Sequence, residues 1–543
     1  MRIFAAQINP IIGDLQGNTQ RILQIIKYGK EQNAELVLFP ELALSGYPPE
    51  DFLLLPHFME SIEKNLEEIV QASKAIIVVV GLPRRTPFKG EKILHNSAAI
   101  IQDQKLLGYA DKSLLPTYDV FDERRYFEPG GPLKVWNLNG ETIGITICED
   151  LWQHSNFIHS THYNRDPVLE LKGMNPTLLL NLSASPYSLF KFRTRLKVCL
   201  KAAKTLECPV ILCNQVGGND SLIFDGHSLV VNQDGLIHCA KGFLEDTFLI
   251  DVKKLTPPLH VEHHLLNDLY EALVLGVHDY FKKSGFKTAC LGLSGGIDSA
   301  LVASIAAQAL GPQNVLAVYM PSRYSATESS RDAAQLAKKL NIQYQEISIE
   351  GPFESYLSLL APTFANYPTD TTEENLQARI RGMLLMALSN KFGHIVLSTG
   401  NKSELAMGYA TLYGDMCGGL GVVSDLTKQQ IYALAEWINR HEEIIPWNTL
   451  KRAPTAELRL NQKDSDSLPD YEIIDTVLQA YVEEHQSPQW IAKRYGYPLV
   501  LVEQLVKRIH TNEYKRRQAP PGLRISERSF SVGRRFPIVQ KWV

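Results

Sequence analysis

The sequence predicts two α/β domains in one chain, a layered α/β domain followed by a doubly wound domain built on a parallel sheet. Its 543 residues are too many for one ordinary core, so two large domains are expected. Short β-rich runs alternate with amphipathic stretches in both halves. A proline-bearing, weakly periodic stretch separates the halves at 255–262. We therefore expect domains at 1–252 and 263–543, joined by a linker at 253–262.

Composition and charge exclude several classes of protein. A net charge of −4 gives no electrostatic footprint for nucleic acid. There is no basic leader with an apolar stretch behind it and no apolar run of membrane-spanning length, so we expect a cytoplasmic protein with no membrane partner. Seven cysteines without a C-x-x-C pair argue against a disulfide framework or a zinc site. Most of them are expected to be small buried hydrophobes.

The first half carries the alternation of a layered α/β domain. Several of its strand-like runs are apolar enough to be buried on both faces. Strands are expected at 2–8, 35–39, 75–80, 97–102, 142–148, 177–182 and 209–213, and helices at 18–32, 59–73 and 192–206.

Three reactive side chains stand at or just beyond β-rich runs in this half. Glu41 follows one run, Cys148 ends another, and Lys112 lies in 110–116. A cysteine attacks as its thiolate, so a carboxylate such as Glu41 could take the proton and Lys112 could stabilise an oxyanion. Taken separately, each residue has an ordinary alternative. Cys148 could be a core thiol, Glu41 a cap and Lys112 a solvated surface charge.

Taken together, the segments around these residues resemble the nitrilase superfamily of C–N hydrolases. The likeness covers Phe39-Pro-Glu-Leu42, Lys112 with the downstream 121–127 run, and Ile147-Cys-Glu-Asp-Leu-Trp152. It implies a four-layer α-β-β-α sandwich and a Glu-Lys-Cys triad at Glu41, Lys112 and Cys148. The stretch 181–187 and Lys191 are similar to the glutamine-holding part of the glutamine-hydrolysing branch. By that likeness, the glutamine contacts are Tyr118, Ser185 and Lys191.

In the second half, the run Leu291-Gly-Leu-Ser-Gly-Gly-Ile-Asp-Ser299 lies between a predicted strand and a predicted helix. Glycines at such a turn can direct backbone N–H groups at an anion, and the helix N-terminus adds positive potential. The Gly-Lys-[Ser/Thr] ending of a Walker A loop is absent. Asp298 stands there instead, which suits Mg²⁺ bridging a carboxylate and phosphate oxygens. The alternative is a capped turn with Asp298 or Ser299 as N-cap.

A β-α-β rhythm continues beyond this turn, with strands expected at 314–320 and 343–349 and a helix at 327–340. Ligands on parallel sheets bind at the carboxyl ends of strands. The run 394–404 is a strand followed by Thr399 and then by a helix start bearing Glu404. Glu404 could therefore join Asp298 on a metal. A capping box formed by Asn401 and Glu404 is the competing interpretation.

The turn at 294–299 resembles the loop of the N-type ATP pyrophosphatases, which implies an adenine nucleotide alpha hydrolase-like fold and an adenylated intermediate. Five further runs resemble, in order, the synthetase domain of the glutamine-dependent NAD⁺ synthetase family. They are 375–382, 398–408, 412–415, 454–458 and 514–520. Tyr514 departs from the histidine that some relatives carry there, so its role is open.

This resemblance implies the ligands of the second domain. The implied ATP contacts are Gly292, Leu293, Ser294, Gly295, Gly296, Ile297, Asp298, Ser299, Thr399, Lys428 and Thr455. Mg²⁺ is expected at Asp298 and Glu404, and deamido-NAD at Asn375, Glu404 and Lys515.

The two resemblances together imply an amidating enzyme. Ammonia from glutamine would convert deamido-NAD to NAD⁺, with ATP split to AMP and pyrophosphate. Small molecules would be its partners, and we expect a homo-oligomer. The residues alone indicate only a thiol hydrolase joined to a nucleotide-activating domain. Another adenylating amidotransferase, acting on an aspartate or a purine carbonyl, and a binding protein with two degenerate enzyme domains therefore remain alternatives.

Overall fold

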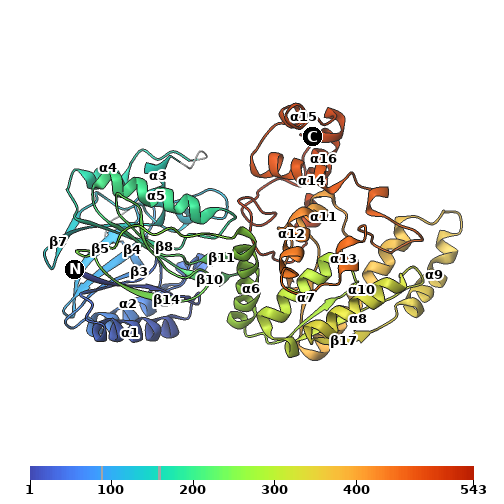
Figure 1. Cartoon of the computed structure of the whole chain (residues 1–543), viewed down its shortest axis with the longest axis horizontal. Helices are drawn as coiled ribbons and strands as arrows, with labels where there is room; N and C mark the ends of the chain where they lie inside the picture. The colour runs from blue at the N-terminus through green and yellow to red at the C-terminus, as the bar shows by residue number, and fades with distance from the viewer. Residues whose placement is uncertain (87–89, 157–160, 543) are drawn as a thin grey trace. The chain divides into compact units, whose positions relative to one another are not determined.

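A computed structural model describes residues 1–86, 90–156 and 161–542 of the chain (Figure 1). The chain forms two compact units, Met1–Leu265 and Leu266–Val543. The segment predicted as a linker, 253–262, belongs to the first unit, where the Leu259 N–H donates to the Leu236 carbonyl.

The first unit contains two six-stranded sheets. Both are mixed, with parallel strands at the centre and antiparallel strands at the edges. The first has the order β14 (Asp246–Asp251), β1 (Arg2–Gln7), β2 (Leu36–Leu38), β3 (Ile77–Arg85), β4 (Leu94–Gln102) and β5 (Lys105–Asp111). The second has the order β13 (Leu236–Cys239), β12 (Leu229–Val231), β9 (Val210–Asn214), β8 (Leu178–Ser183), β7 (Glu141–Ile147) and β6 (Val135–Leu138). A separate hairpin pairs β10 (Val216–Asn219) with β11 (Leu222–Asp225).

Alternation along the strands builds four layers. Val37 and Val78 point into the cluster that also contains Ile22 and Ile62 of the first two helices. Their neighbours in the strands point the other way, into the core between the two sheets. A third cluster joins the outer face of the second sheet to the helices that cover it. The predicted α-β-β-α sandwich is therefore the observed arrangement.

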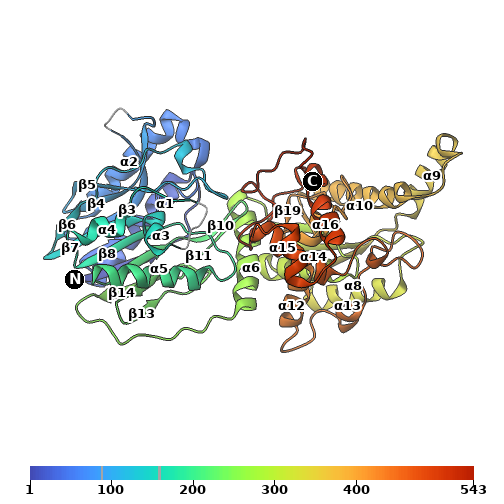
Figure 2. The same cartoon turned by 90° about the horizontal axis from the view of Figure 1, so that it is seen from above.

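The helices cover the outer faces of this sandwich. Figures 1 and 2 show α1 and α2 on the side of the first sheet and α4 and α5 on the side of the second. The helix predicted at 18–32 begins earlier, at Leu15, because the Asp14 carboxylate caps it by accepting from the Gly17 N–H. The bounds are α1 (Leu15–Glu31), α2 (Pro56–Ala72), α3 (Trp152–Ser155), α4 (Pro167–Lys172) and α5 (Lys191–Leu206).

The second unit is built on a five-stranded sheet whose neighbouring strands are all parallel. Its order is β17 (Gln343–Glu346), β16 (Val315–Tyr319), β15 (Ala289–Gly292), β18 (Ile395–Ser398) and β19 (Leu420–Gly421). The strand order reverses between β15 and β18, which is where doubly wound sheets bind their ligands. The turn that begins at Leu293 and the one that begins at Thr399 leave the sheet at these two neighbouring strands.

Helices surround this sheet. Side chains of α9 and α10 pack with Cys290 and Val318 in one cluster, and a separate helical cluster forms at the C-terminal side of the unit (Figure 1). The helices are α6 (Leu265–Ser284), α7 (Ile297–Leu310), α8 (Thr327–Leu340), α9 (Glu350–Phe364), α10 (Thr371–Phe392), α11 (Lys402–Met407), α12 (Lys428–Ile438), α13 (Trp447–Lys451), α14 (Tyr471–Leu478), α15 (Pro488–Tyr495), α16 (Leu499–Thr511) and α17 (Glu513–Arg516).

The described helices include none whose length and apolar character would let it span a bilayer. The main differences from the predicted elements are additional short strands in the first unit. The edge strands β5 and β6 and the strands β10 to β14 were not predicted. Several of these runs contain glycine or charged residues, which weakens the β signal.

Candidate active sites

The residues Glu41, Lys112 and Cys148 meet in the first unit. Glu41 follows β2 and Lys112 follows β5 of the first sheet, whereas Cys148 follows β7 of the second. All three are buried, with exposed fractions of 0%, 1% and 7%. The group is therefore assembled from both sheets of the sandwich.

Hydrogen bonds fix the carboxylate and the ammonium of this group. Lys112 Nζ lies 2.7 Å from Glu41 Oε1 and 2.7 Å from Glu123 Oε1. Glu41 Oε1 also accepts from Asn96 Nδ2 at 2.7 Å, and Glu41 Oε2 accepts from the Ala184 N–H at 2.9 Å. Glu123 lies in the 121–127 run, but its role had no signal of its own in the sequence. One lysine is thus shared between two buried carboxylates.

The electrostatics of the group favour a charged lysine and a neutral thiol. Burial alone would lower the pKa of Lys112, but the carboxylates of Glu123 and Glu41 outweigh it and hold that pKa well above its ordinary value. Burial, assisted by the charge of Glu41, raises the pKa of the Cys148 thiol. Because the thiol is protonated in the free protein, it needs a base when substrate arrives, and Glu41 is placed to serve.

The turn that carries Cys148 is held by a buried carboxylate. Cys148 has a φ of 38°, a left-handed conformation that costs a non-glycine residue about 1–3 kcal/mol. Asp150 Oδ2 accepts from the Ile147 N–H at 2.9 Å, and Asp150 Oδ1 accepts from the N–H groups of Ser113 and Leu114 at 3.0 and 2.9 Å. Asp150 therefore ties the turn of the cysteine to the segment that follows Lys112.

A second carboxylate next to the cysteine faces two tyrosines. The Tyr118 hydroxyl donates to Glu149, at 2.9 Å from Oε2, and the Tyr163 hydroxyl donates to Glu149 Oε1 at 3.0 Å. Burial raises the pKa of Glu149 to about 7, although Lys112 and both tyrosine hydroxyls oppose the shift. Tyr118 was predicted to contact glutamine, whereas Glu149 was not singled out. The feature of the sequence that could have indicated a role for Glu149 is its position directly after Cys148.

The other two predicted glutamine contacts also lie next to this group. Ser185 is buried, one residue after Ala184, and its N–H donates to Asn214 Oδ1 at 2.9 Å. Lys191 begins α5, with its Nζ 4.3 Å from the ring centre of Trp152 in the turn after Cys148. Ser185 therefore lies near Glu41, and Lys191 lies near the turn that carries Cys148.

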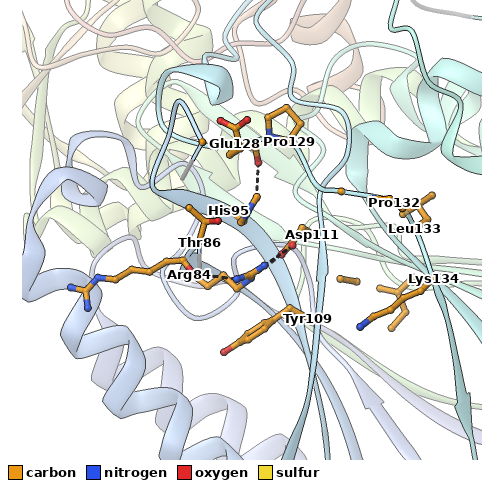
Figure 3. Close-up of a pocket in the computed structure, with 15 residues that line it drawn as sticks. Arg84, Thr86, His95, Tyr109, Asp111, Glu128, Pro129, Pro132, Leu133 and Lys134 are labelled. Atoms are coloured by element: carbon orange, nitrogen blue, oxygen red, sulfur yellow. Dashed lines mark hydrogen bonds and ion pairs between the residues drawn. The ribbon is translucent and has the colours of Figure 1, made fainter. Parts of the chain in front are cut away.

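The first unit also has a cavity of about 870 Å³, lined mainly by the ends of β3 and β5 and by the 128–134 segment that precedes β6 (Figure 3). The Arg84 guanidinium in it holds Asp111 through two hydrogen bonds of 2.9 and 2.6 Å and lies 4.8 Å from the centre of the Tyr109 ring. The described residues that line this cavity do not include Glu41, Lys112 or Cys148. It is thus distinct from the thiol site.

In the second unit, the turn after β15 opens a cavity of about 300 Å³. Every predicted ATP contact from Gly292 to Ser299 lines it, and so do Thr399, Lys428 and Thr455. Gly295 has a φ of 81°, and a Cβ there would lie 2.5 Å from the Ser329 carbonyl oxygen, so only glycine fits. The absence of a side chain at Gly295 therefore allows α8 to lie this close to the backbone of the turn.

Asp298 and Glu404 face each other across the two neighbouring strand ends. Lys428 Nζ lies 2.5 Å from Asp298 Oδ2 and 3.6 Å from Glu404 Oε1. Asn401 Nδ2 donates to Asp298 Oδ1 at 2.8 Å. Burial and the charge of Asp298 raise the pKa of Glu404 to about 8.

The structure bears on the two helix-capping alternatives for these residues. Gly296, rather than Asp298 or Ser299, is the N-cap of α7. The capping box of Asn401 and Glu404 does exist, because the Asn401 N–H donates to Glu404 Oε2 at 3.2 Å and the Glu404 N–H donates to Asn401 Oδ1 at 2.9 Å. It uses only one oxygen of Glu404, so the capping and metal-binding interpretations are compatible.

Asn375 and Lys515, predicted to contact deamido-NAD, are not among the described residues that line this cavity. Asn375 Oδ1 accepts from the Thr411 hydroxyl at 2.7 Å. Lys515 Nζ donates to the carbonyls of Gly408 and Ala410 at 2.7 and 2.8 Å. Both therefore hold the segment that follows α11, beside Glu404.

Two cavity-lining cations, Arg381 and Arg452, were not predicted from the sequence. Arg452 is paired with Asp332 and Glu457. Arg381 of α10 donates from Nε to the Met320 carbonyl at 3.0 Å. Burial lowers its pKa to about 10, and no carboxylate of a described residue forms an ion pair with it. A guanidinium with donors left over at the wall of a cavity is suited to an acceptor on a ligand.

Comparison with known proteins identifies both units. The carbon-nitrogen hydrolase family model matches residues 2–254, and the NAD synthase family model matches residues 269–519. A glutamine-dependent NAD(+) synthetase of Synechocystis sp. is 45% identical to the chain, with 99% of this chain and 98% of that protein covered. The chain belongs to the glutamine-dependent NAD(+) synthetase family.

Other members of the glutamine-dependent NAD(+) synthetase family agree. The protein of Acinetobacter baylyi is 42% identical, with 100% of this chain and 98% of that protein covered. A solved structure of the Acinetobacter baumannii enzyme, in complex with adenosine diphosphate, matches with a TM-score of 0.78 and 39% identity over 100% of this chain and 99% of that one. The Cytophaga hutchinsonii synthetase shares the fold at 22% identity, with a TM-score of 0.85 over 99% and 98% of the two chains. The predicted family and fold class are confirmed.

Proposed function

We propose that this protein is a ligase that amidates deamido-NAD to NAD⁺, with ammonia taken from glutamine and ATP split to AMP and pyrophosphate. The observation that carries the proposal is the presence of two complementary sites in one chain of this family. One unit holds a thiol beside a buried glutamate–lysine pair, and the other holds a glycine turn with two carboxylates at neighbouring strand ends. The first supplies nitrogen, and the second activates the acceptor.

Glutamine hydrolysis begins when Glu41 takes the thiol proton of Cys148 and the sulfur attacks the side-chain carbonyl of glutamine. Lys112 stabilises the oxyanion, because its charge is retained in the buried site. The C–N bond breaks as Glu41 returns the proton to the leaving ammonia. Glu41 then deprotonates a water molecule, which attacks the thioester and releases glutamate.

Recognition of glutamine uses groups next to the thiol. Glu149 is the carboxylate that suits the substrate's α-ammonium group, and the hydroxyl of Tyr118 orients it. Ser185 and Lys191 lie beside Glu41 and the turn of Cys148, respectively, and contact the rest of the amino acid. Glu149 and Lys191 thus offer charges opposite to those of the α-ammonium and α-carboxylate groups of glutamine.

In the second unit, ATP binds with its phosphates on the N–H groups of the turn at 294–299 and at the start of α7. Thr399, Lys428 and Thr455 complete the ATP contacts, and we add Arg381 to them. Asp298 and Glu404 fit Mg²⁺, since each carboxylate has one oxygen held by Asn401 and another directed at a shared position. Mg²⁺ held there would neutralise charge on the phosphates of ATP.

The acceptor is activated in this same site. A carboxylate oxygen of the nicotinate ring attacks the α-phosphorus of ATP, and pyrophosphate leaves. Ammonia then attacks the acyl carbon and displaces AMP. Asn375, Glu404 and Lys515 hold deamido-NAD, and the contacts of Asn375 and Lys515 with the 408–411 segment support a site next to Glu404.

We further propose that the protein acts in the cytoplasm as a homo-oligomer. Its proposed substrates are intracellular metabolites. Exposed apolar side chains on and near α9 and α10, such as Leu359, Tyr367 and Met383, support contact with another copy. Light scattering during size-exclusion chromatography tests the oligomer, and a monomer at micromolar concentration would refute it.

The experiment that tests the proposed reaction is a panel of acceptors incubated with ATP and with glutamine or ammonium. We expect NAD⁺, AMP and pyrophosphate when deamido-NAD is present. We expect no product with aspartate or with a purine nucleotide that carries an amidatable carbonyl. Amidation of one of those acceptors instead of deamido-NAD would favour another adenylating amidotransferase. Absence of both glutaminase turnover and ATP cleavage would favour a pair of degenerate domains.

A further inference from the structure

The two carboxylates of the nucleotide site direct their available oxygens at the same cation. Asn401 holds Asp298 Oδ1 and Glu404 Oε2. The remaining oxygens, Asp298 Oδ2 and Glu404 Oε1, lie 2.5 and 3.6 Å from Lys428 Nζ. The ammonium of Lys428 therefore stands where a divalent cation bridging the two carboxylates would have to stand.

These carboxylates alone make an incomplete metal site. Mg²⁺ requires close to octahedral coordination by oxygens and is commonly held by one or two carboxylates together with phosphate oxygens and water. Within the described ranges, no group of three or more acidic, histidine or cysteine side chains is placed to hold a metal. Phosphate oxygens of a bound nucleotide must therefore complete the coordination.

Lys428 has a second position within reach of its side chain. Its backbone is fixed, because its N–H donates to the Ser403 hydroxyl at 3.1 Å and Thr427 caps α12 just before it. The side chain lines the same cavity as the phosphate turn at 294–299. The flexible lysine stem can thus carry the ammonium from the carboxylates to phosphate oxygens without movement of the helix.

A permanent structural ion pair is the simpler alternative. Such a pair is found elsewhere in this unit, where the fully buried Lys402 lies between Asp425 and Glu483. The side chains of these two carboxylates are 3% and 23% exposed, and none of the three residues lines the cavity. The Lys428 pair differs because all three of its residues line the cavity, where the two carboxylate side chains are 17% and 19% exposed. An ion pair open to an anionic ligand can exchange its partner.

We propose that Lys428 occupies the metal position in the nucleotide-free protein and leaves it only when ATP phosphates accept its ammonium, so that metal and nucleotide bind together. This inference rests on the proposed function, because it takes ATP and a divalent metal as ligands of this site. The cation also prevents repulsion between Asp298 and Glu404 before ligand arrives. A free metal ion must displace a like charge and is therefore bound weakly.

The test measures Mn²⁺ binding to the whole chain without nucleotide, by electron paramagnetic resonance of the free ion. For Lys428→Met, which removes the charge but keeps the volume, we expect Mn²⁺ affinity to rise by about tenfold or more over the wild type, since one like charge at contact distance is gone. Lys428→Arg is the matched control. It keeps the positive charge and should show no gain.

Two further measurements decide the origin of the gain. Adding Glu404→Gln to Lys428→Met should abolish it, and thermal unfolding curves should show that each variant is folded. A non-hydrolysable ATP analogue should strengthen Mn²⁺ binding far more in the wild type than in Lys428→Met. An unchanged or weaker Mn²⁺ affinity in folded Lys428→Met, or a gain that survives Glu404→Gln, would overturn the inference. If the wild type makes NAD⁺ regardless, the proposed function stands. If the wild type makes none, the proposed function itself fails.

Discussion

The thiol site and the nucleotide site of this protein each contain a lysine between two carboxylates, but the two groups differ in how far they are exposed. In the first unit, Lys112 is shared by Glu41 and Glu123, and all three side chains are at most 5% exposed. In the second unit, Lys428 is shared by Asp298 and Glu404, which line an open cavity. Both sites are a lysine between two carboxylates, yet only the second stands beside the glycine turn at 294–299, which we propose binds phosphate.

The difference indicates how each site is completed. The lysine of the thiol site is locked by its partners, so its charge is available to an oxyanion without rearrangement, as electrostatic catalysis requires. The lysine of the nucleotide site neutralises the two carboxylates that we propose bind Mg²⁺ together with ATP. We infer that the lysine–carboxylate group of the first unit keeps its arrangement when substrate binds. The group of the second unit rearranges when ATP and the metal bind.

The largest expected effect comes from Asp298. Asp298→Ala removes one of the two carboxylates at the metal position, so the phosphates of ATP lose their counter-charge. Synthesis of NAD⁺ should be abolished with glutamine and with ammonia alike. Product formation by liquid chromatography measures it, and near-normal ammonia-driven synthesis would remove Asp298 from the metal site.

Removal of the thiol should abolish the reaction with glutamine and leave the reaction with ammonia. Cys148→Ala leaves no nucleophile for the amide of glutamine, but among the residues that the structure describes, none of the first unit lines the nucleotide cavity. NAD⁺ should still form from ammonia and should not form from glutamine. If a folded variant makes no NAD⁺ from either glutamine or ammonia, the nucleotide site depends on the thiol site.

Lys112 should affect the chemical step more than binding. Lys112→Met removes the cation that faces the oxyanion, and loss of one such partner typically lowers kcat by roughly 10²–10³. Glutaminase turnover should fall by this factor, with ammonia-driven synthesis unchanged. The steady-state parameters for glutamine provide the check, since an effect confined to KM would assign Lys112 to substrate binding.

The smallest expected effect concerns Glu149 and pH. Burial raises the pKa of Glu149 to about 7, so below that pH the free protein holds it mostly neutral and it cannot pair with the α-ammonium of glutamine. KM for glutamine should therefore rise as pH falls through 7, by up to about tenfold per pH unit. Glu149→Gln should give a high KM with little dependence on pH in this range. A wild-type KM that is flat between pH 6 and 8 would contradict this role.

The sequence predicts those parts of each site that sit at the ends of strongly patterned strands. Apolar runs precede Glu41, Cys148 and Asp298, and the topology brings the strand before Asp298 next to the strand before Glu404. Lys112 follows β5, a strand that was not predicted, and it is assigned by the resemblance of its segment. The layered α/β class and the parallel sheet follow from the same alternation, whereas the four-layer sandwich was implied by the resemblance to the nitrilase superfamily. Strand ends are predictable because period and burial are local signals.

Other residues could not be found in this way, because their roles depend on contacts between distant segments. Glu123 accepts hydrogen bonds from Lys112 and from Tyr47, which lies far from it in the sequence. Asn96 donates a hydrogen bond to Glu41, which follows a different strand. Arg381 lies on a helix with little amphipathic pattern and is recognisable only by the cavity that it faces. The position of Lys428 between two carboxylates likewise requires three segments to be folded together.

The central claim is that nitrogen released at the thiol site becomes the amide nitrogen made at the nucleotide site. It is tested most directly by incubating the wild-type protein with deamido-NAD, ATP and glutamine labelled with ¹⁵N in the side-chain amide. We predict NAD⁺ whose carboxamide carries ¹⁵N, with one AMP formed for each NAD⁺. Labelled ammonium without labelled NAD⁺, or NAD⁺ without the label, would contradict the account.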